Sequence, residues 1–427
     1  MSKVASLADI PKSPHELEDY VAALFQSAHY FVEKNITERD ITDILELDAV
    51  ATSYEGANPS TVLAEAKSGR WGFPDIFKVI GWMRYLDIPR GAFFVSKDVP
   101  GKDSQAVQQK VGPFGLAFVH LGDFSDATSR FRAAGFPEVK DSLMMEIWRF
   151  SYWMERRLID KLRVIAKSDP SKEGPREALE YHRLINDGIF FVKDVRDRLH
   201  QLYHAFQTHP KLSLGIASEM GGGPFDPDAV DPANPIIREA MLKGKHDQLQ
   251  ASFYAEHRAR LAILKAAIDY ECLVGAGSSP ATTGVWIPVL PGSFELGLKA
   301  LKGEPFFKRY PLFWQVFLWG FGGFYLEDRK DEEFKWLSEQ TGIPPGEIPR
   351  ALRAFDVLFP TQGSWLTSIG PSQCRIIKMV PTAFQGLGAY HRRRRYGFKE
   401  YKEFGYTDHT ARDLGKWNNA GVDLLIS

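Results

Sequence analysis

Three residues with metal-binding or acid–base chemistry lie close together in the N-terminal part of the sequence. Glu65 and Lys67 are two residues apart in the segment VLAEAKS, and Asp48 lies in the preceding segment LELDAVA. Residues two apart on a β-strand project from the same face, so Glu65 and Lys67 would lie side by side. Two carboxylates beside an ammonium group suit the binding of Mg²⁺ or Mn²⁺ and the hydrolysis of a phosphodiester, because hard cations prefer oxygen ligands and recruit phosphate oxygens.

The two segments are predicted to form a β-hairpin. Residues 44–54 and 60–68 are strand-like runs separated by a short loop that contains glycine and proline. With the turn centred on this loop, Asp48 falls opposite Lys67. It then lies diagonal to Glu65, at about 7–8 Å between Cα atoms, which is close enough for two carboxylates to share one cation. A slip of one residue in the register would send Asp48 to the other face of the sheet.

Other interpretations of this spacing stay open at the level of sequence. A Glu and a Lys on one strand are also typical of an ion pair on a solvated sheet face. Asp40, Asp43 and Glu46 are further acids nearby. Glu46 would share the face of Asp48. The carboxylate that accompanies Glu65 is therefore predicted to be Asp48, with Glu46 as its strongest competitor.

The surrounding sequence alternates helical and strand-like patterns at short spacing. An amphipathic run that follows Ser13 and Pro14 predicts the first helix, because serine is a favoured N-cap and proline a favoured first helical residue. Apolar strands joined by helices predict an α/β architecture with a mixed sheet flanked by helices. The expected elements are a helix at 13–28, the hairpin, a helix at 74–86, a strand at 91–96, a helix at 102–110 and a strand at 115–121.

Together these features resemble the PD-(D/E)XK nuclease superfamily. Asp48, followed on the next strand by Glu65-Ala66-Lys67, is similar to the motif that names the superfamily. Residues 17–24 (LEDYVAAL) resemble the first helix of Mrr-type restriction endonucleases, whose Glu falls on Glu18. The order of elements is also similar. The resemblance covers the first 125 residues and implies a restriction-endonuclease-like fold for them.

The resemblance implies a metal-dependent nuclease and a role for each matching residue. Asp48 and Glu65 would bind Mg²⁺, with Mn²⁺ as a substitute, and the carbonyl of Ala66 would be a third ligand. Lys67 would position the attacking water, and Glu18 would be an accessory carboxylate. The products would carry a 5′-phosphate and a 3′-hydroxyl group.

The resemblance also implies partners and a setting. The substrate would be DNA, the role would be restriction or another defence against foreign DNA, and the assembly would be a homodimer or a complex with a defence-system protein. Two alternatives are an RNA-directed nuclease and a catalytically silent module that binds nucleic acid or a partner protein. One residue departs from the family pattern, because Leu47 stands where a Pro often precedes the Asp.

The rest of the chain is predicted to form two further domains after the nuclease-like domain at 1–125. The periodicity weakens between residues 122 and 141, which predicts a boundary. Long helical patterns then run over residues 142–166, 175–207 and 235–270. They predict a mainly helical domain at 142–275. An aromatic-rich α+β domain of unknown role is expected at 276–427.

The densest basic patch of the sequence lies near its C-terminal end. The run HRRRRY contains Arg392, Arg393, Arg394 and Arg395 and is followed by further aromatic and basic residues. Arginines interleaved with aromatic residues are typical of surfaces that bind phosphates and stack on bases, so these four are predicted to bind nucleic acid. The alternative is a solvated basic turn, or a set of partners for acids of the same chain.

Composition excludes several classes of protein. The 427 residues include 53 Lys and Arg against 54 Asp and Glu, so the chain is not a basic nucleic-acid coat protein. Only 2 Cys are present, which argues against a disulfide framework or a four-cysteine zinc site and favours a reducing, cytoplasmic compartment. No signal peptide is recognised at the N-terminus. The longest apolar run, 311–326, is shorter than the roughly 20 residues that span a bilayer, so a core helix or strand pair and no membrane partner are expected there, with interfacial membrane contact as the alternative.

Overall fold

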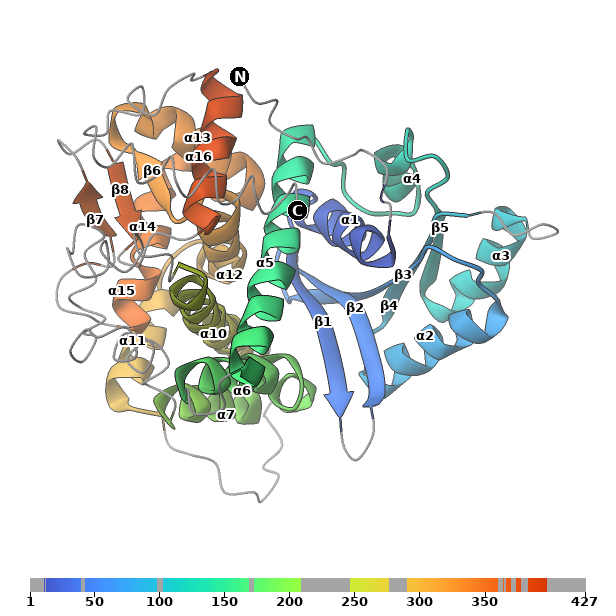
Figure 1. Cartoon of the computed structure of the whole chain (residues 1–427), viewed down its shortest axis with the longest axis horizontal. Coiled ribbons are helices and arrows are strands. Elements are labelled where there is room, and N and C mark those ends of the chain that lie inside the picture. Colours follow the sequence, from blue (N-terminus) through green and yellow to red (C-terminus); the bar gives the residue numbers. More distant parts are fainter. Residues whose placement is uncertain are drawn as a thin grey trace. The chain divides into compact units, whose positions relative to one another are not determined.

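The computed structural model divides into two compact units (Figure 1). Of the described residues, those up to 153 and those at 186–193 form the first, called here the sheet unit, and those at 154–185 and from 194 onward form the second, the helical unit. The predicted division into domains at 1–125, 142–275 and 276–427 stays a prediction. The structure describes residues 11, 13–39, 43–97, 103–168, 173–208, 246–275, 290–359, 364, 366–369, 374–377 and 383–397.

A five-stranded mixed sheet forms the centre of the sheet unit, which confirms the expected α/β class. The strands lie side by side in the order of the sequence, β1 to β5. The first three pair antiparallel, whereas β3, β4 and β5 run parallel to one another. Their bounds are β1 (Phe31–Arg39), β2 (Asp43–Ser53), β3 (Ser60–Lys67), β4 (Arg90–Val95) and β5 (Leu116–His120).

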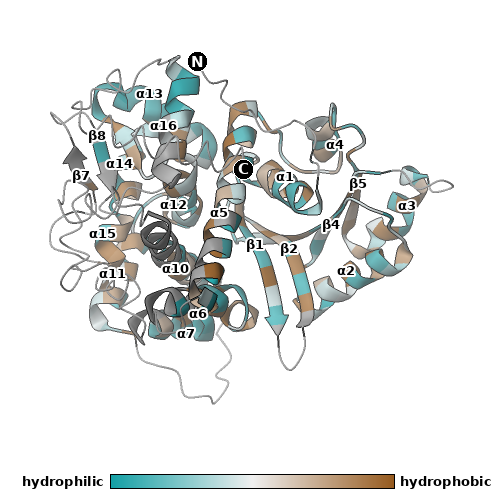
Figure 2. Cartoon of the chain, in the orientation of Figure 1, coloured by the Kyte–Doolittle hydropathy of each residue, from teal (hydrophilic) through white to brown (hydrophobic). Residues whose placement is uncertain are grey.

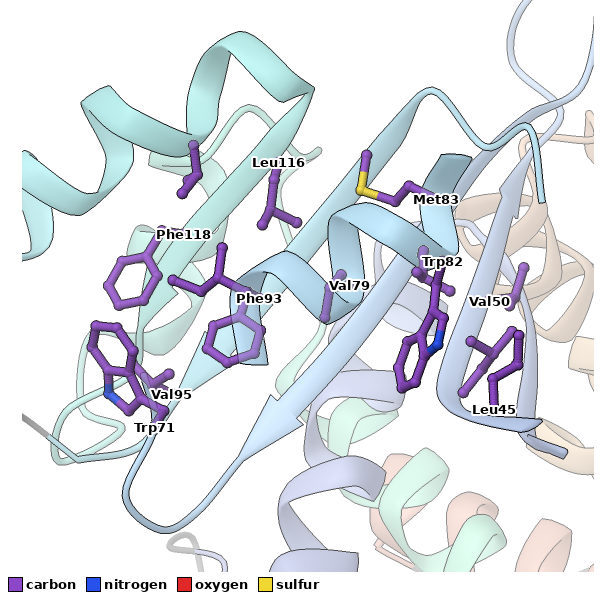
Figure 3. Close-up of a cluster of buried hydrophobic side chains, with 14 of the residues drawn as sticks. Leu45, Val50, Trp71, Val79, Trp82, Met83, Phe93, Val95, Leu116 and Phe118 are labelled. Atoms are coloured by element: carbon purple, nitrogen blue, oxygen red, sulfur yellow. The ribbon is translucent and has the colours of Figure 1, made fainter. Parts of the chain in front are cut away.

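Helices cover both faces of this sheet. They are α1 (Pro14–Ser27), α2 (Phe73–Tyr85), α3 (Ser104–Val111) and α4 (Ala127–Ala133), with the start of the long helix α5 (Ser142–Ser168). Phe94 of β4 meets Phe25 of α1 with ring centroids 5.9 Å apart. Its neighbour Phe93 points to the opposite face, where it packs with Val79 of α2 and Val107 of α3 (Figure 3).

The local sequence explains where α1 and α2 begin. Ser13 caps α1, because its hydroxyl oxygen accepts a hydrogen bond from the backbone N–H of Glu16 at 3.2 Å. In α2 the backbone N–H of Gly72 donates to the carboxylate of Asp75 at 2.8 Å, and a proline occupies the first turn of each helix. These starts agree with the predicted helices to within a residue or two.

The register of β2 against β3 differs from the predicted one by two residues. Ala49 pairs with Ala64, so the next position along the same ladder brings Asp48 opposite Glu65 rather than opposite Lys67. A shift of two keeps every side chain on its expected face, whereas a shift of one would have reversed the faces. In the observed register Asp48 and Glu65 are therefore opposite each other, whereas the predicted register placed them on a diagonal.

The strand β1 is absent from the sequence prediction. Its sequence, FVEKNITER, places Glu33 and Lys34 in the middle of an otherwise strand-like run. The ammonium group of Lys34 is buried and forms an ion pair with Asp19 of α1, and it lies 4.7 Å from the ring centroid of Tyr152 of α5. A charged residue that is buried with its partner breaks the alternation of polar and apolar residues on which the prediction of a strand depends.

Helices make up most of the helical unit. They are the continuation of α5 from Met154, α6 (Glu173–Asn186), α7 (Val195–Thr208), α10 (His246–Gly275), α11 (Gly292–Lys302), α12 (Tyr310–Gln315), α13 (Lys330–Thr341), α14 (Ile348–Leu352), α15 (Ala354–Leu358) and α16 (Ala383–Tyr396). A small sheet in the order β6-β8-β7 joins β6 (Phe324–Leu326), β7 (Leu366–Ile369) and β8 (Cys374–Ile377). Hydrophobic and hydrophilic residues alternate along α5 (Figure 2), as in an amphipathic helix.

The single helical pattern predicted at 175–207 is two helices. A turn at residues 187–194 separates α6 from α7. The side chain of Asp194 accepts hydrogen bonds from the backbone N–H groups of Arg196 and Asp197, at 2.9 and 3.0 Å, and so starts a new helix. In the predicted helix at 235–270, residues 235–245 lie outside the described part. No helix in the described ranges is long and apolar enough to cross a bilayer.

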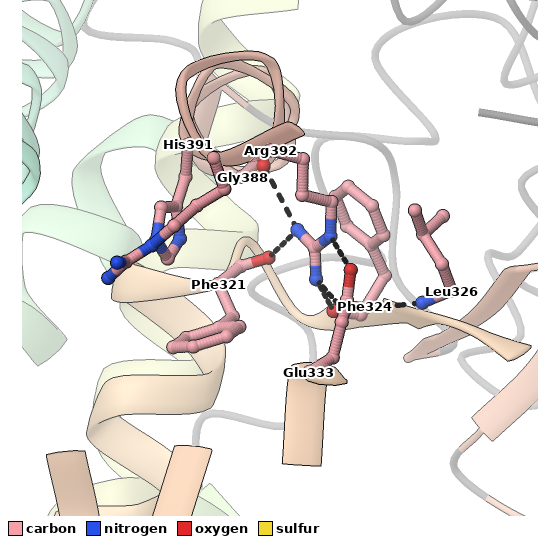
Figure 4. A network of polar contacts seen from close by, with 8 residues as sticks. Phe321, Phe324, Leu326, Glu333, Gly388, His391 and Arg392 are labelled. Atoms are coloured by element: carbon pink, nitrogen blue, oxygen red, sulfur yellow. Dashed lines mark hydrogen bonds and ion pairs between the residues drawn. The ribbon is translucent and has the colours of Figure 1, made fainter. Parts of the chain in front are cut away.

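Arg392 is a buried centre of hydrogen bonding in the helical unit (Figure 4). Its side chain is 1% exposed and forms a two-point ion pair with Glu333 of α13, with both N···O distances at 2.7 Å. The guanidinium also donates to the carbonyl oxygens of Phe321, Phe324 and Gly388, and it lies 3.9 Å from the ring centroid of Phe324. Arg392 thereby ties α16 to α13 and β6.

The prediction that Arg392 binds nucleic acid is wrong for this reason, since a buried guanidinium whose donors are engaged cannot reach a phosphate. The arginines that follow Arg392 are less buried. Arg394 is exposed and donates to the hydroxyl of Tyr390 at 3.1 Å. Arg395 is half-buried and donates to the imidazole of His391 at 3.1 Å. For Arg393, Arg394 and Arg395 nucleic-acid binding stays a prediction.

Replacing Arg392 should destabilise the protein far more than replacing Arg394. In Arg392→Met the carboxylate of Glu333 loses its partner while it stays buried, so we expect a loss of about 3–5 kcal/mol in the free energy of unfolding. Arg394→Met removes the same charge at the surface and should change stability by less than about 0.5 kcal/mol. Urea unfolding of the full chain measures both, and equal values would contradict the structural role of Arg392.

Two glycines of the sheet unit should respond to alanine in opposite directions. Gly81 lies in the middle of α2, and a Cβ placed there would meet no atom within 4 Å, so Gly81→Ala should stabilise the protein by about 0.5–1 kcal/mol. Gly115 has a φ of +79°, and its Cβ would lie 2.3 Å from the carbonyl oxygen of Pro89. Gly115→Ala should therefore lower the melting temperature, and circular dichroism on heating tests both changes.

Candidate active site

Asp48, Glu65 and Lys67 lie together on the adjacent strands β2 and β3, as the sequence predicted. The carboxylate of Asp48 accepts a hydrogen bond from the backbone N–H of Ala66 at 2.7 Å. The ammonium group of Lys67 lies 3.1 Å from the carboxylate of Glu65. The side chain of Glu65 is 5% exposed and that of Lys67 is 31% exposed, so the pair runs from the protein interior to its surface.

The end of β3 is held in place by the neighbouring strand. Glu65 and Lys67 continue the face on which Leu63 packs into the core beneath α2. The carbonyl oxygen of Lys67 accepts a hydrogen bond from the backbone N–H of Ser96 at 3.2 Å. In the loop that follows, the indole N–H of Trp71 donates to the carbonyl oxygen of Lys97 at 3.3 Å. The polar end of β3 is therefore fixed beside β4.

The pKa values of the carboxyl groups of Asp48 and Glu65 are both raised. Burial raises the pKa of Asp48 well above its ordinary value, and the negative charges of Glu65 and Glu18 raise it further, whereas the N–H of Ala66 and the charge of Lys67 oppose the shift. Burial also raises the pKa of Glu65, against the opposing effects of Lys67 and Lys78. Ionisation of either carboxyl group alone is unfavourable, so the pair favours a shared proton or a bound cation.

Lys67 keeps its positive charge at this position. Burial lowers the pKa of Lys67, but the charge of Glu65, its hydrogen bond and the charge of Asp48 outweigh that effect and raise the pKa overall. An ammonium group with a raised pKa is a poor proton acceptor at neutral pH. Lys67 therefore suits the orientation of a water molecule and the stabilisation of negative charge.

Glu18 belongs to the same electrostatic group, although it lies on α1. Its charge acts on Asp48, and its carboxylate lies 3.1 Å from the imidazole of His15. Glu46, the competing candidate, is exposed, so Asp48 is the β2 carboxylate that joins Glu65. The competitor Asp40 lies outside the described residues. The structure therefore brings Asp48, Glu65 and Lys67 together, whereas Glu18 of α1 acts on Asp48 through its charge.

Sequence analysis missed two charged residues on α2 that act on the site. The charge of Asp75 raises the pKa of Lys67, and that of Lys78 lowers the pKa of Glu65. Asp75 and Lys78 are three residues apart and so lie on one side of α2. The signal that could have identified them is their position in the helix that follows directly on the strand with Glu65 and Lys67.

The residues at this site fit a hard divalent cation. Mg²⁺ is commonly held by one or two carboxylates and keeps several of its waters, so Asp48 and Glu65 are a sufficient protein contribution. A divalent cation would also offset the repulsion that raises both pKa values. In the described part of the chain, no group of three or more His, Cys, Asp or Glu side chains is placed to hold a metal ion.

Searches against models of known protein families, against curated proteins and against solved structures gave no match.

Removing the charge of Asp48 should stabilise the protein and abolish its response to metal. In EDTA, Asp48→Asn should raise the melting temperature by the equivalent of about 0.5–2 kcal/mol, because the amide removes a buried charge that repels Glu65. The gain should shrink at low pH, where Asp48 of the wild type becomes neutral as well. Added Mg²⁺ or Mn²⁺ should raise the melting temperature of the wild type and leave that of the variant unchanged.

The matched control is Glu46→Gln, which removes an exposed charge from the same strand. In EDTA this variant should melt at the wild-type temperature, and added Mg²⁺ or Mn²⁺ should raise its melting temperature as in the wild type. A loss of stability in Asp48→Asn under EDTA would contradict the interpretation, because it would mean that the ionised carboxylate is stabilised by its surroundings. Differential scanning fluorimetry at several pH values measures all three proteins.

Proposed function

We propose that the sheet unit is a metal-dependent nuclease of the PD-(D/E)XK type that hydrolyses phosphodiester bonds in DNA. The observation that carries the proposal is the adjacency of Asp48 and Glu65 on paired strands, with Lys67 at 3.1 Å from Glu65. Carboxyl groups with raised pKa values beside a charged lysine are typical of functional sites.

The order of elements supports the same function. A helix that carries Glu18 precedes an antiparallel hairpin, and the second hairpin strand continues into a parallel sheet through α2. This order is the one that the resemblance to restriction-endonuclease-like folds implies. The absence of Pro before Asp48, where Leu47 stands, does not alter the position of the carboxylate, which is fixed by the backbone N–H of Ala66.

Each residue has a role that its surroundings support. Asp48 and Glu65 would hold Mg²⁺, with the carbonyl of Ala66 as the third ligand that the resemblance implies, and Mn²⁺ would substitute. The bound ion would supply Lewis-acid chemistry at the phosphate and at a coordinated water. The charged Lys67 would orient the attacking water and offset negative charge that develops on the phosphate. Glu18 would tune the charge of Asp48 from α1.

The biological setting forms part of the proposal through the resemblance alone. The resemblance implies a role in restriction or defence against foreign DNA. It also implies a homodimer or a complex with a defence-system partner protein. The same carboxylates would serve an RNA backbone, since both nucleic acids present the same phosphodiester group to the metal. A substrate comparison therefore belongs in the first experiment.

The test is cleavage of plasmid DNA, linear single-stranded DNA and RNA by the full chain with Mg²⁺. We expect metal-dependent products with a 5′-phosphate and a 3′-hydroxyl group. Glu65→Gln and Lys67→Ala should each lower the cleavage rate by at least about 100-fold, because each removes a group that acts on the developing charge. Product ends are identified by their response to phosphatase and polynucleotide ligase.

Glu46→Gln and Lys299→Ala are the controls, since both residues are exposed and lie outside the cluster. Both should cut at the wild-type rate. If Glu65→Gln and Lys67→Ala cut as fast as the wild type, the site is wrongly assigned. If no substrate is cut and calorimetry detects no Mn²⁺ site that Asp48→Ala removes, the sheet unit is a silent binding module.

A further inference from the structure

An exposed aromatic stripe runs along the outer side of α2. Phe77 is 59% exposed and Tyr85 is 46% exposed, and they are two of the five large hydrophobic side chains that stand exposed in the described residues. Phe73, Phe77, Gly81 and Tyr85 follow one another at intervals of four residues on one side of the helix, and Phe73 at the start of this stripe is half-buried against the core. Large exposed aromatic residues on one side of a helix make that side a candidate binding surface.

The rings of this stripe are held in place by the fold. The ring centroids of Phe73 and Phe77 lie 6.1 Å apart. The hydroxyl of Tyr85 donates a hydrogen bond to the carboxylate of Glu38 on β1 at 2.8 Å. The stripe therefore presents fixed aromatic faces, which lose little conformational freedom when a ligand stacks on them.

Positive charges flank the stripe. The ammonium group of Lys110 lies 5.3 Å from the ring centroid of Phe73, and that of Lys193 lies 5.5 Å from the ring centroid of Tyr85. Lys78 and Arg84 are exposed on α2 itself. Aromatic faces bordered by cations complement a strand that carries phosphates and flat bases, and the exposed Lys110 and Arg84 favour such a ligand over an apolar protein partner.

Gly81 leaves a gap in the stripe between Phe77 and Tyr85. A helix-interior glycine costs stability, and no atom of the protein lies within 4 Å of where its Cβ would be, so the fold itself does not require it. A missing side chain on an exposed helix face permits the close approach of another molecule. The backbone of α2 is therefore open to solvent at Gly81, between Phe77 and Tyr85.

The stripe begins beside the candidate active site. Only residues 68–72 separate the end of β3 at Lys67 from the start of α2 at Phe73, so the first turn of the helix lies near the strand end that carries Glu65 and Lys67. From Phe73 the stripe extends along the helix for about 18 Å, at 1.5 Å per residue. A strand whose phosphate reached the carboxylates could therefore continue along α2.

We infer that the outer face of α2 binds an unpaired stretch of nucleic-acid strand next to the cleavage site, with a base stacked on Phe77. The inference rests on the proposed function for the choice of ligand and narrows the substrate class to strands with unstacked bases. In a duplex the faces of the bases are covered by their neighbours, so an aromatic platform of this kind discriminates in favour of single strands, frayed ends or flaps.

The test measures binding of fluorescein-labelled dT20 and of the dT20·dA20 duplex to the full chain by fluorescence anisotropy, in EDTA so that no strand is cut. We expect the single strand to bind at least about tenfold more tightly than the duplex. Phe77→Ala should weaken binding of dT20 about tenfold, which corresponds to about 1.4 kcal/mol, and should leave the duplex unaffected. Phe77→Trp should restore the affinity, and Phe77→Leu should not.

Leu296→Ala is the matched control, because Leu296 is a 70% exposed hydrophobic residue on α11 of the helical unit. Its affinity for dT20 should equal that of the wild type. An unchanged affinity in Phe77→Ala, full affinity in Phe77→Leu or equal binding of duplex and single strand would overturn the inference. A dimer that dissociates in Phe77→Ala on sedimentation would also overturn it, since α2 would then be a contact between copies of the chain.

Failure of this inference is distinguishable from failure of the proposed function. Binding of dT20 that depends on Phe77, in a chain that never cuts nucleic acid with Mg²⁺, would refute the catalysis and keep the binding surface. Metal-dependent cleavage that requires Glu65 and Lys67, with dT20 affinity unchanged in Phe77→Ala, would keep the catalysis and refute the surface on α2.

Discussion

The antiparallel pairing of β2 with β3 is the constraint on which the candidate site depends. Its register sets Asp48 beside Glu65, and the backbone N–H of Ala66 holds the carboxylate of Asp48 in that position. The ionised forms of these two acids repel each other, and burial penalises both of them. Val50 and Leu63 of the same two strands pack in the hydrophobic core and stabilise the pairing. The free energy gained in the core therefore offsets the cost of burying two neighbouring carboxylates.

The helices on the two faces of the sheet bring different charges to the candidate site. On one face, α1 packs through Phe25 and brings Glu18 within the electrostatic reach of Asp48. On the other face, α2 covers the core, and Lys78 in its second turn offsets part of the charge of Glu65. Both helices begin at caps that are visible in the sequence, so the position of each charge follows from where its helix starts.

Sequence reasoning reached the residues of the site but not their spacing. A period of two fixes the face of a strand residue, so Asp48, Glu65 and Lys67 were grouped correctly. Register depends on the geometry of the loop, which a pattern does not contain, and the prediction was two residues away from the observed pairing. The strand that carries Lys34 was missed because its charge is compensated by Asp19, fifteen residues earlier on another element.

The basic residues show why local density of charge is a weak guide to where a phosphate binds. Four consecutive arginines stand out in the sequence, yet Arg392 is buried against Glu333 and holds together the elements around it. Lys78 and Lys110 stand alone in the sequence and are exposed, and their ammonium groups lie near the rings of Trp82 and Phe73 respectively. A chain with almost equal numbers of acids and bases can therefore still offer a cationic path, because exposure and neighbouring groups decide which charges meet a ligand.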